Sequence, residues 1–115
     1  MNKFSDIIVE VKKDIAIVTV NLIRATFKEA GEFNNTLKDI ISRGFKKVIV
    51  DMHEVEFIDS TFLGSLVVNL KKIKNIDGKL ILANLSKSVY SVVEYASLNK
   101  TFIIFQSIED ALTYI

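Results

Sequence analysis

Residues 46–68, KKVIVDMHEVEFIDSTFLGSLVV, change their hydrophobic pattern halfway along, and this change decides the fold. The first part, KKVIVDM, is an apolar run without alternation, which is typical of a strand that is covered on both faces. The last part places Leu63, Leu66 and Val67 at helical spacing. The stretch therefore predicts a buried strand, a short loop and a helix, in that order.

The segments before this stretch predict a hairpin and a first helix. Two β-branched runs, residues 6–11 and 15–20, are separated by the charged turn KKD and indicate an antiparallel hairpin. A helix is expected over residues 25–43, because Thr26 and Glu29 have the spacing of a capping box at its start. The apolar stripe of this helix consists of Ala30, Phe33, Leu37, Ile40 and Ile41.

The segments after it continue the alternation of strand and helix. The runs KLILANL and TFIIF predict strands at residues 79–85 and 101–105. The helix that the opening stretch begins is expected over residues 61–75, a third helix over residues 86–98, and a last one after Ser107. The predicted buried face of the third helix is Val89, Val92, Val93 and Ala96.

This order of elements predicts one α/β domain over residues 1–115. Strands that are joined by crossover helices lie parallel, because such connections are right-handed. The expected architecture is a mixed β-sheet with an N-terminal β-hairpin, parallel later strands and about four helices.

The composition excludes several classes of protein. The chain has no cysteine, which excludes disulfides and zinc–thiolate sites, and its single histidine, His53, excludes a histidine-rich metal site. Fifteen basic residues against fourteen acidic ones argue against direct nucleic-acid binding. No apolar run reaches the ~20 residues of a membrane helix, and the first residues lack the pattern of a signal peptide. We therefore expect a cytoplasmic protein with no membrane insertion and no cofactor.

Asp59, Ser60 and Thr61 form a polar cluster at the start of the second helix. One explanation is structural, because aspartate, serine and threonine are preferred helix N-caps. Three such residues in a row exceed what one cap needs. The other explanation is functional, because a serine at a helix N-terminus can receive a phosphate that the free backbone N–H groups partly stabilise. The residues by themselves leave both explanations open.

The run VIVDMHEVEFIDSTFLGSLV, residues 48–67, resembles the signature of the STAS domain, named for sulfate transporters and anti-sigma factor antagonists. The resemblance extends over the whole chain and is most specific at the Asp-Ser-Thr-x-Leu-Gly core. It implies a bacterial signalling protein without enzymatic activity, an anti-sigma factor antagonist. Such a protein binds an anti-sigma factor that is also a serine protein kinase, and thereby releases a sigma factor in transcription regulation.

Carried onto this chain, the resemblance implies that Ser60 is the phosphorylated residue and that its modification ends binding. Asp59 would orient the site, and Thr61 would stand beside the phosphorylated serine. The implied partners are the anti-sigma factor kinase and a phosphatase that restores the unmodified form.

Three further residues, Phe62, Arg24 and Gly64, are expected at the partner-binding surface. Phe62 and Arg24 depart from the family pattern, which often has glycine at the first position and an acidic residue at the second. We interpret Phe62 as an exposed aromatic anchor for the partner. We interpret Arg24 as a group that selects the partner or that holds phosphorylated Ser60.

An alternative is a STAS adaptor subunit of a larger signalling assembly or of a lipid-transport complex. In that case Ser60 is a helix cap, and its phosphorylation has no role. The neighbouring genes would separate the two hypotheses, because a kinase-type anti-sigma factor supports the switch and a transporter operon supports the adaptor.

Overall fold

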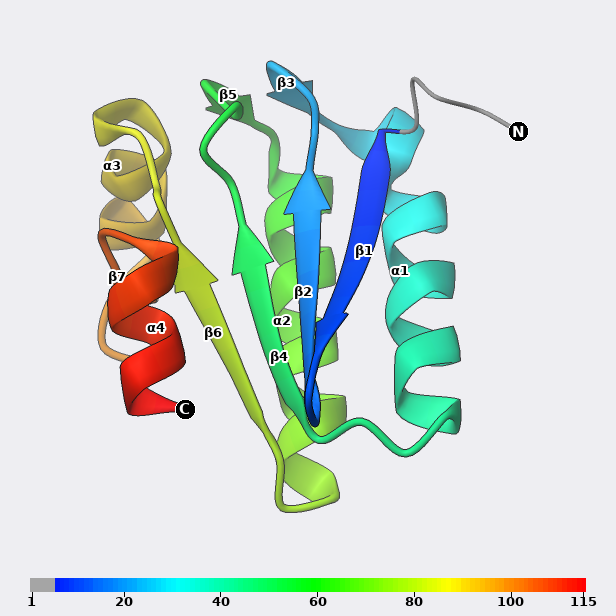
Figure 1. The fold of residues 1–115 in the computed structure, drawn as a ribbon. Coiled ribbons are helices and arrows are strands. Elements are labelled where there is room, and N and C mark those ends of the chain that lie inside the picture. The colour runs from blue at the N-terminus through cyan, green and yellow to red at the C-terminus, as the bar shows by residue number, and fades with distance from the viewer. Residues whose placement is uncertain (1–5) are drawn as a thin grey trace.

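The computed structural model describes residues 6–115, which build a five-stranded mixed sheet with the order β1-β2-β4-β6-β7 (Figure 1). Strands β1 (Ile7–Lys12) and β2 (Ile15–Val20) form the expected antiparallel hairpin. All other neighbours in this sheet are parallel. The later strands are β4 (Lys47–Asp51), β6 (Lys79–Ala83) and β7 (Ile103–Phe105). The predicted fold class is therefore confirmed.

Helices cover both faces of the sheet in the described part of the chain. They are α1 (Phe27–Ser42), α2 (Ser60–Asn75), α3 (Lys87–Tyr95) and α4 (Ile108–Tyr114). Helices α1, α2 and α3 share one core cluster, whereas α4 packs on the opposite face, in front of β6 and β7 in Figure 1. Strand β4 lies between the two clusters, which explains why its apolar run does not alternate.

The apolar stripes of the first two helices point into the core as predicted. In α2, Leu66 is fully buried and Leu70 keeps 4% of its exposure, so the helical period assigned to this segment is correct. In α1, Thr26 and Glu29 form the complete capping box. Ile41 differs slightly from the expectation, because it is only partly buried at the margin of the core.

The third helix differs from the prediction in its length and in its buried face. It ends at Tyr95, and only Val89 and Val93 of the expected face are buried. Val92 and Ala96 are exposed, so their assignment to the core was wrong. The reason is geometric: α3 contacts the core along a single i, i+4 pair, and Ala96 already lies at the C-cap.

A second, very short sheet joins the loops that precede α1 and α2, and the sequence did not predict it. Strand β3 (Arg24–Ala25) pairs in parallel with β5 (Phe57–Ile58). The backbone N–H groups of Glu56 and Phe57 also donate to the carbonyl oxygen of Ile23, at 2.8 and 3.1 Å. This small sheet therefore brings the starts of the two helices together at one end of the molecule (Figure 1).

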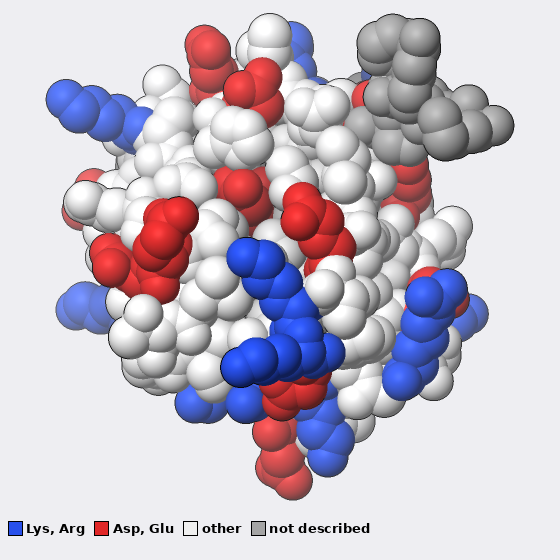
Figure 2. Space-filling view, viewed as in Figure 1, with Lys and Arg blue, Asp and Glu red and all other residues white. Residues whose placement is uncertain are grey.

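Two surface features bear on the classes of partner. No helix within residues 6–115 has the length and apolar content needed to cross a membrane. On the face of the molecule shown in Figure 2, acidic and basic side chains are interspersed. The described part of that face thus offers no continuous basic track for a nucleic-acid backbone.

Candidate functional site

The carboxylate of Asp59 lies where the N-termini of α1 and α2 meet. Its Oδ1 accepts a hydrogen bond from the backbone N–H of Phe62 at 2.8 Å, which makes Asp59 the N-cap of α2. Its Oδ2 accepts a second hydrogen bond from the backbone N–H of Phe27, the first residue of α1, at 2.9 Å. One side chain therefore satisfies free donors of two helices at once.

Ser60 and Thr61 begin α2, and both side chains are exposed. Among the described residues, neither hydroxyl makes a hydrogen bond, and the backbone N–H groups of the same two residues also have no partner. Because Asp59 provides the cap, the structure of the helix does not need the Ser60 hydroxyl. The cluster of three polar residues thus divides into one structural carboxylate and two hydroxyls that face solvent.

The expectation that Phe62 is an exposed anchor is wrong. Phe62 has no exposed surface, and its ring packs against that of Phe33 with centroids 5.0 Å apart and a tilt of 47°. The physical reason is helical phase, because Phe62 stands one turn before Leu66 and therefore on the buried stripe of α2. Its bulk belongs to the contact between α1 and α2.

Arg24 and Gly64 lie on the surface, as a binding surface requires. The guanidinium of Arg24 stacks on the ring of Phe57, 4.1 Å from the ring centroid. Gly64 follows Ser60 by one turn of α2, and a Cβ added to it would meet no atom within 4 Å. The side of α2 that carries Ser60 is therefore open.

Three large apolar side chains near Asp59 and Ser60 were not predicted from the sequence. Ile23, Phe27 and Phe57 keep 60%, 64% and 42% of their exposure, and we call them the apolar rim. They come from two stretches of the chain, residues 23–27 and Phe57, and the β3–β5 pairing together with the Asp59 bond to Phe27 brings these stretches side by side. No spacing in the sequence links Phe57 to Ile23 and Phe27, so only the tertiary structure could reveal this patch.

The loop after β4 is held by a buried carboxylate. Asp51 is 8% exposed, and its Oδ1 accepts hydrogen bonds from the backbone N–H of His53 at 3.1 Å and from the Asn84 side chain at 3.0 Å. The Nδ1 atom of His53 lies 3.1 Å from the same oxygen. In the described part of the chain, no group of three or more histidine or acidic residues could hold a metal ion. These contacts tie the loop after β4 to Asp51 and to the end of β6.

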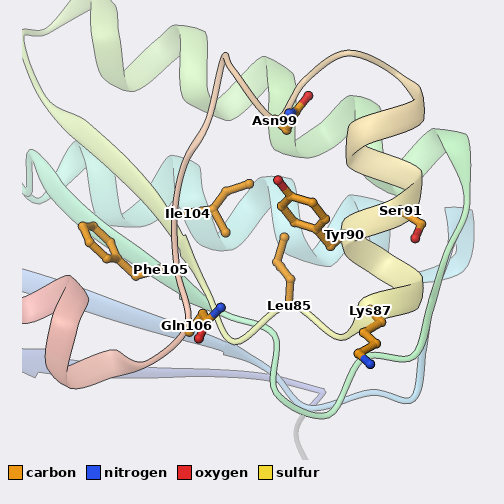
Figure 3. A pocket seen from close by; sticks show the side chains of 8 residues that line it. All are labelled: Leu85, Lys87, Tyr90, Ser91, Asn99, Ile104, Phe105 and Gln106. Carbon is orange, nitrogen blue, oxygen red and sulfur yellow. The ribbon is translucent and has the colours of Figure 1, made fainter.

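An open hollow of about 750 Å³ lies between α3, β7 and the loop after β6. Figure 3 shows that Leu85, Tyr90 and Ile104 point toward one another within it, whereas Lys87 points away. None of its lining residues belongs to the cluster around Asp59 or to the apolar rim. The predicted site is thus a surface at a helix start and not part of this hollow.

The comparisons with known proteins agree with this architecture. The model of the STAS domain family matches residues 5–111. A Thermotoga neapolitana protein, named as a homologue of the anti-sigma factor antagonist TM1081, is 28% identical over 74 residues, which are 64% of this chain and 66% of that protein. The match thus spans just under two thirds of that relative.

Two solved structures share the fold. The crystal structure of the anti-sigma factor antagonist TM1081 from Thermotoga maritima superposes with a TM-score of 0.87 at 23% identity, over 95% of this chain and 93% of that one. The Bacillus cell fate determinant SpoIIAA, in its phosphorylated form, gives a TM-score of 0.74 at 17% identity, over 94% and 97% of the two chains. Since the family model covers nearly the whole sequence, this chain belongs to the STAS domain family.

Proposed function

We propose that this protein is an anti-sigma factor antagonist that binds an anti-sigma factor with serine kinase activity and is released when Ser60 is phosphorylated. The Thermotoga neapolitana relative and the TM1081 structure carry the name anti-sigma factor antagonist, and the SpoIIAA structure is a phosphorylated form. The observation that carries the proposal is the Ser60 hydroxyl, which is exposed and has no hydrogen-bond partner in the described structure. Helix capping would otherwise explain a serine at this position, but Asp59 provides the cap of α2.

The surroundings of Ser60 suit a phosphate that stays on the surface. The free backbone N–H groups of Ser60 and Thr61 lie at the positive end of the α2 dipole and can donate to phosphate oxygens. A phosphoserine carries a charge of about −1.5 to −2 at neutral pH. The Asp59 carboxylate next to it adds negative charge to the same small area. Phosphorylation therefore makes a patch that already holds one carboxylate strongly anionic.

The partner surface that we propose consists of the apolar rim and the exposed side of α2 around Ser60. Phe27 and Phe57 replace Phe62 as the aromatic anchors, because both rings are exposed beside the helix start. Gly64 allows a partner to approach the backbone of α2 closely. A dianion within such an apolar contact is costly, because its hydration is lost on binding.

Arg24 gives the phosphorylated state a local partner in this proposal. Its stacking on Phe57 is exposed and therefore contributes on the order of 0.5–1 kcal/mol. A charge-assisted hydrogen bond to a phosphate is stronger, so Arg24 can leave the ring for phosphorylated Ser60. That movement would also alter one of the two aromatic anchors.

The experiment is phosphorylation by the kinase-type anti-sigma factor of the same organism with ATP, followed by mass spectrometry. We expect one phosphate on the wild type and on Thr61→Ala, and none on Ser60→Ala. A phosphate that persists on Ser60→Ala and is lost from Thr61→Ala would move the switch by one residue. If no variant gains phosphate, the adaptor hypothesis replaces the phosphorylation switch.

A further inference from the structure

Within residues 6–115, strand β1 is an edge of the main sheet, and its outer backbone groups pair with no other strand. The N–H of Asn21 donates to the carbonyl oxygen of Asp6 at 2.7 Å. The backbone N–H and C=O groups of every second residue after Asp6, which are Ile8, Glu10 and Lys12, therefore point toward β2. The N–H and C=O groups of Ile7, Val9 and Val11 consequently point away from the sheet.

The side chains at this edge are also exposed, although they are apolar. Val9 and Val11 keep 42% and 54% of their exposure on the side of the sheet that carries α1. They form one wall of a groove of about 840 Å³ whose other wall is α1, including Gly31 and Asn35. A Cβ at Gly31 would meet nothing within 4 Å, so this wall is not filled. Proteins usually protect a hydrophobic edge of this kind with proline, charge or a covering element.

The unpaired backbone groups determine the occupant, because only an extended segment can pair with them. For a segment antiparallel to β1, charge determines which end is acidic and which is basic. Asp6 precedes the start of β1, Glu10 lies within the strand, and Lys12 is its last residue. On the α1 wall of the groove, which runs the same way in Figure 1, Glu32 lies nearer the start of the helix, and Arg43 after its end is paired with Asp39 at 3.2 Å. A strand antiparallel to β1 would match this arrangement with an acidic N-terminal end and a basic C-terminal end.

A symmetric second copy fits this edge less well than a single strand. Helix α1 lies beside β1 and beyond the edge of the sheet (Figure 1). Two copies paired through β1 would bring both α1 helices to the same side of the joined strands, where they would crowd each other. A single extended segment brings no second helix to this side. We propose that the β1 edge and its groove bind an extended segment of a partner protein by strand addition. This segment has apolar residues at alternate positions, an acidic start and a basic end.

The test uses the peptide Glu-Val-Lys-Val-Thr-Val-Lys and its charge-reversed counterpart Lys-Val-Glu-Val-Thr-Val-Glu as probes. Each is titrated into the isotope-labelled protein and followed by NMR, with three proteins compared: wild type, Val9→Pro and Val9→Thr. Proline removes the outward N–H of Val9 without removing a hydrogen bond to β2, because that N–H points away from β2. Threonine keeps the N–H and the strand preference, which makes it the matched control.

We expect the first peptide to bind the wild type and Val9→Thr with a Kd of about 0.1–1 mM and to shift the amide signals of Ile7, Val9 and Val11. Binding should fall at least about tenfold with Val9→Pro and with the charge-reversed peptide. Absence of binding at about 2 mM, equal binding by Val9→Pro, or shifts confined to another surface would overturn the proposal. Equal binding of both peptides would overturn the assigned charge pattern and the antiparallel direction. Self-association that Val9→Pro abolishes would make a second copy the occupant and overturn the partner segment.

Discussion

The Oδ2 atom of Asp59 accepts a hydrogen bond from the backbone N–H of Phe27, 32 positions earlier in the chain. The same carboxylate caps α2 through its Oδ1 atom, so the starts of α1 and α2 are tied to one side chain. An aspartate is suited to this double role, because both of its oxygens accept hydrogen bonds. The position next to Ser60 is therefore fixed by two helices, which gives a modifying enzyme or a partner a rigid surface.

We predict a graded loss of stability on substitution of Asp59. Asp59→Ala removes both acceptors and should lower the free energy of unfolding by about 2–3 kcal/mol. Asp59→Asn keeps one carbonyl oxygen, so its loss should be about half as large. Urea unfolding of the two variants measures the difference. An Asp59→Asn variant as stable as the wild type would contradict the prediction, because it would show that the second of the two accepted hydrogen bonds does not contribute to stability.

Phe62→Ala is predicted to destabilise the protein strongly. The ring is fully buried against Phe33, and removing it leaves a cavity between α1 and α2. Substitutions of this kind typically cost 3–5 kcal/mol, so we expect a loss of about that size in chemical unfolding. Phe57→Ala is the matched control, because the same ring is lost at a partly exposed position, and it should cost about 1 kcal/mol or less. An unchanged melting temperature for Phe62→Ala would contradict the buried position.

The apolar rim should govern partner capture and contribute little to stability. Phe27→Ala and Phe57→Ala should each weaken binding of the anti-sigma factor by about tenfold or more, because exposed aromatic anchors often dominate an interface. Tyr95→Ala is the control, since this side chain is 93% exposed on α3 and does not belong to the rim. Titration calorimetry with the three variants measures the effect. Wild-type affinity for both phenylalanine variants would remove the rim from the interface.

The main elements of the fold could be predicted because their sequence patterns repeat over many residues. The continuous run of β4 and the stripe around Leu66 indicate their burial directly. The paired strands β3 and β5 have two residues each, which is too short for any periodicity, so neither they nor the apolar rim could be expected. Phe62 is a different case, because its spacing of four residues from Leu66 already indicated the buried face.

The candidate site could be predicted in its position but not in its division of roles. The sequence places three cap-competent residues before α2 and leaves open which one makes the cap. The geometry assigns that function to Asp59, since the N–H of Phe62 lies 2.8 Å from its carboxylate. The second bond of Asp59 joins residues far apart in the chain, and no local pattern encodes it.

The affinity of one anti-sigma factor for two forms of this protein tests the central claim most directly. The unmodified protein and the protein phosphorylated at Ser60 would be compared by titration calorimetry, with Ser60→Ala as a form that cannot be modified. We predict that phosphorylation weakens binding by about 100-fold or more, since a desolvated dianion in an apolar contact costs on the order of several kcal/mol. Ser60→Ala should bind like the unmodified wild type. Equal affinity of the phosphorylated and unmodified forms would contradict the account.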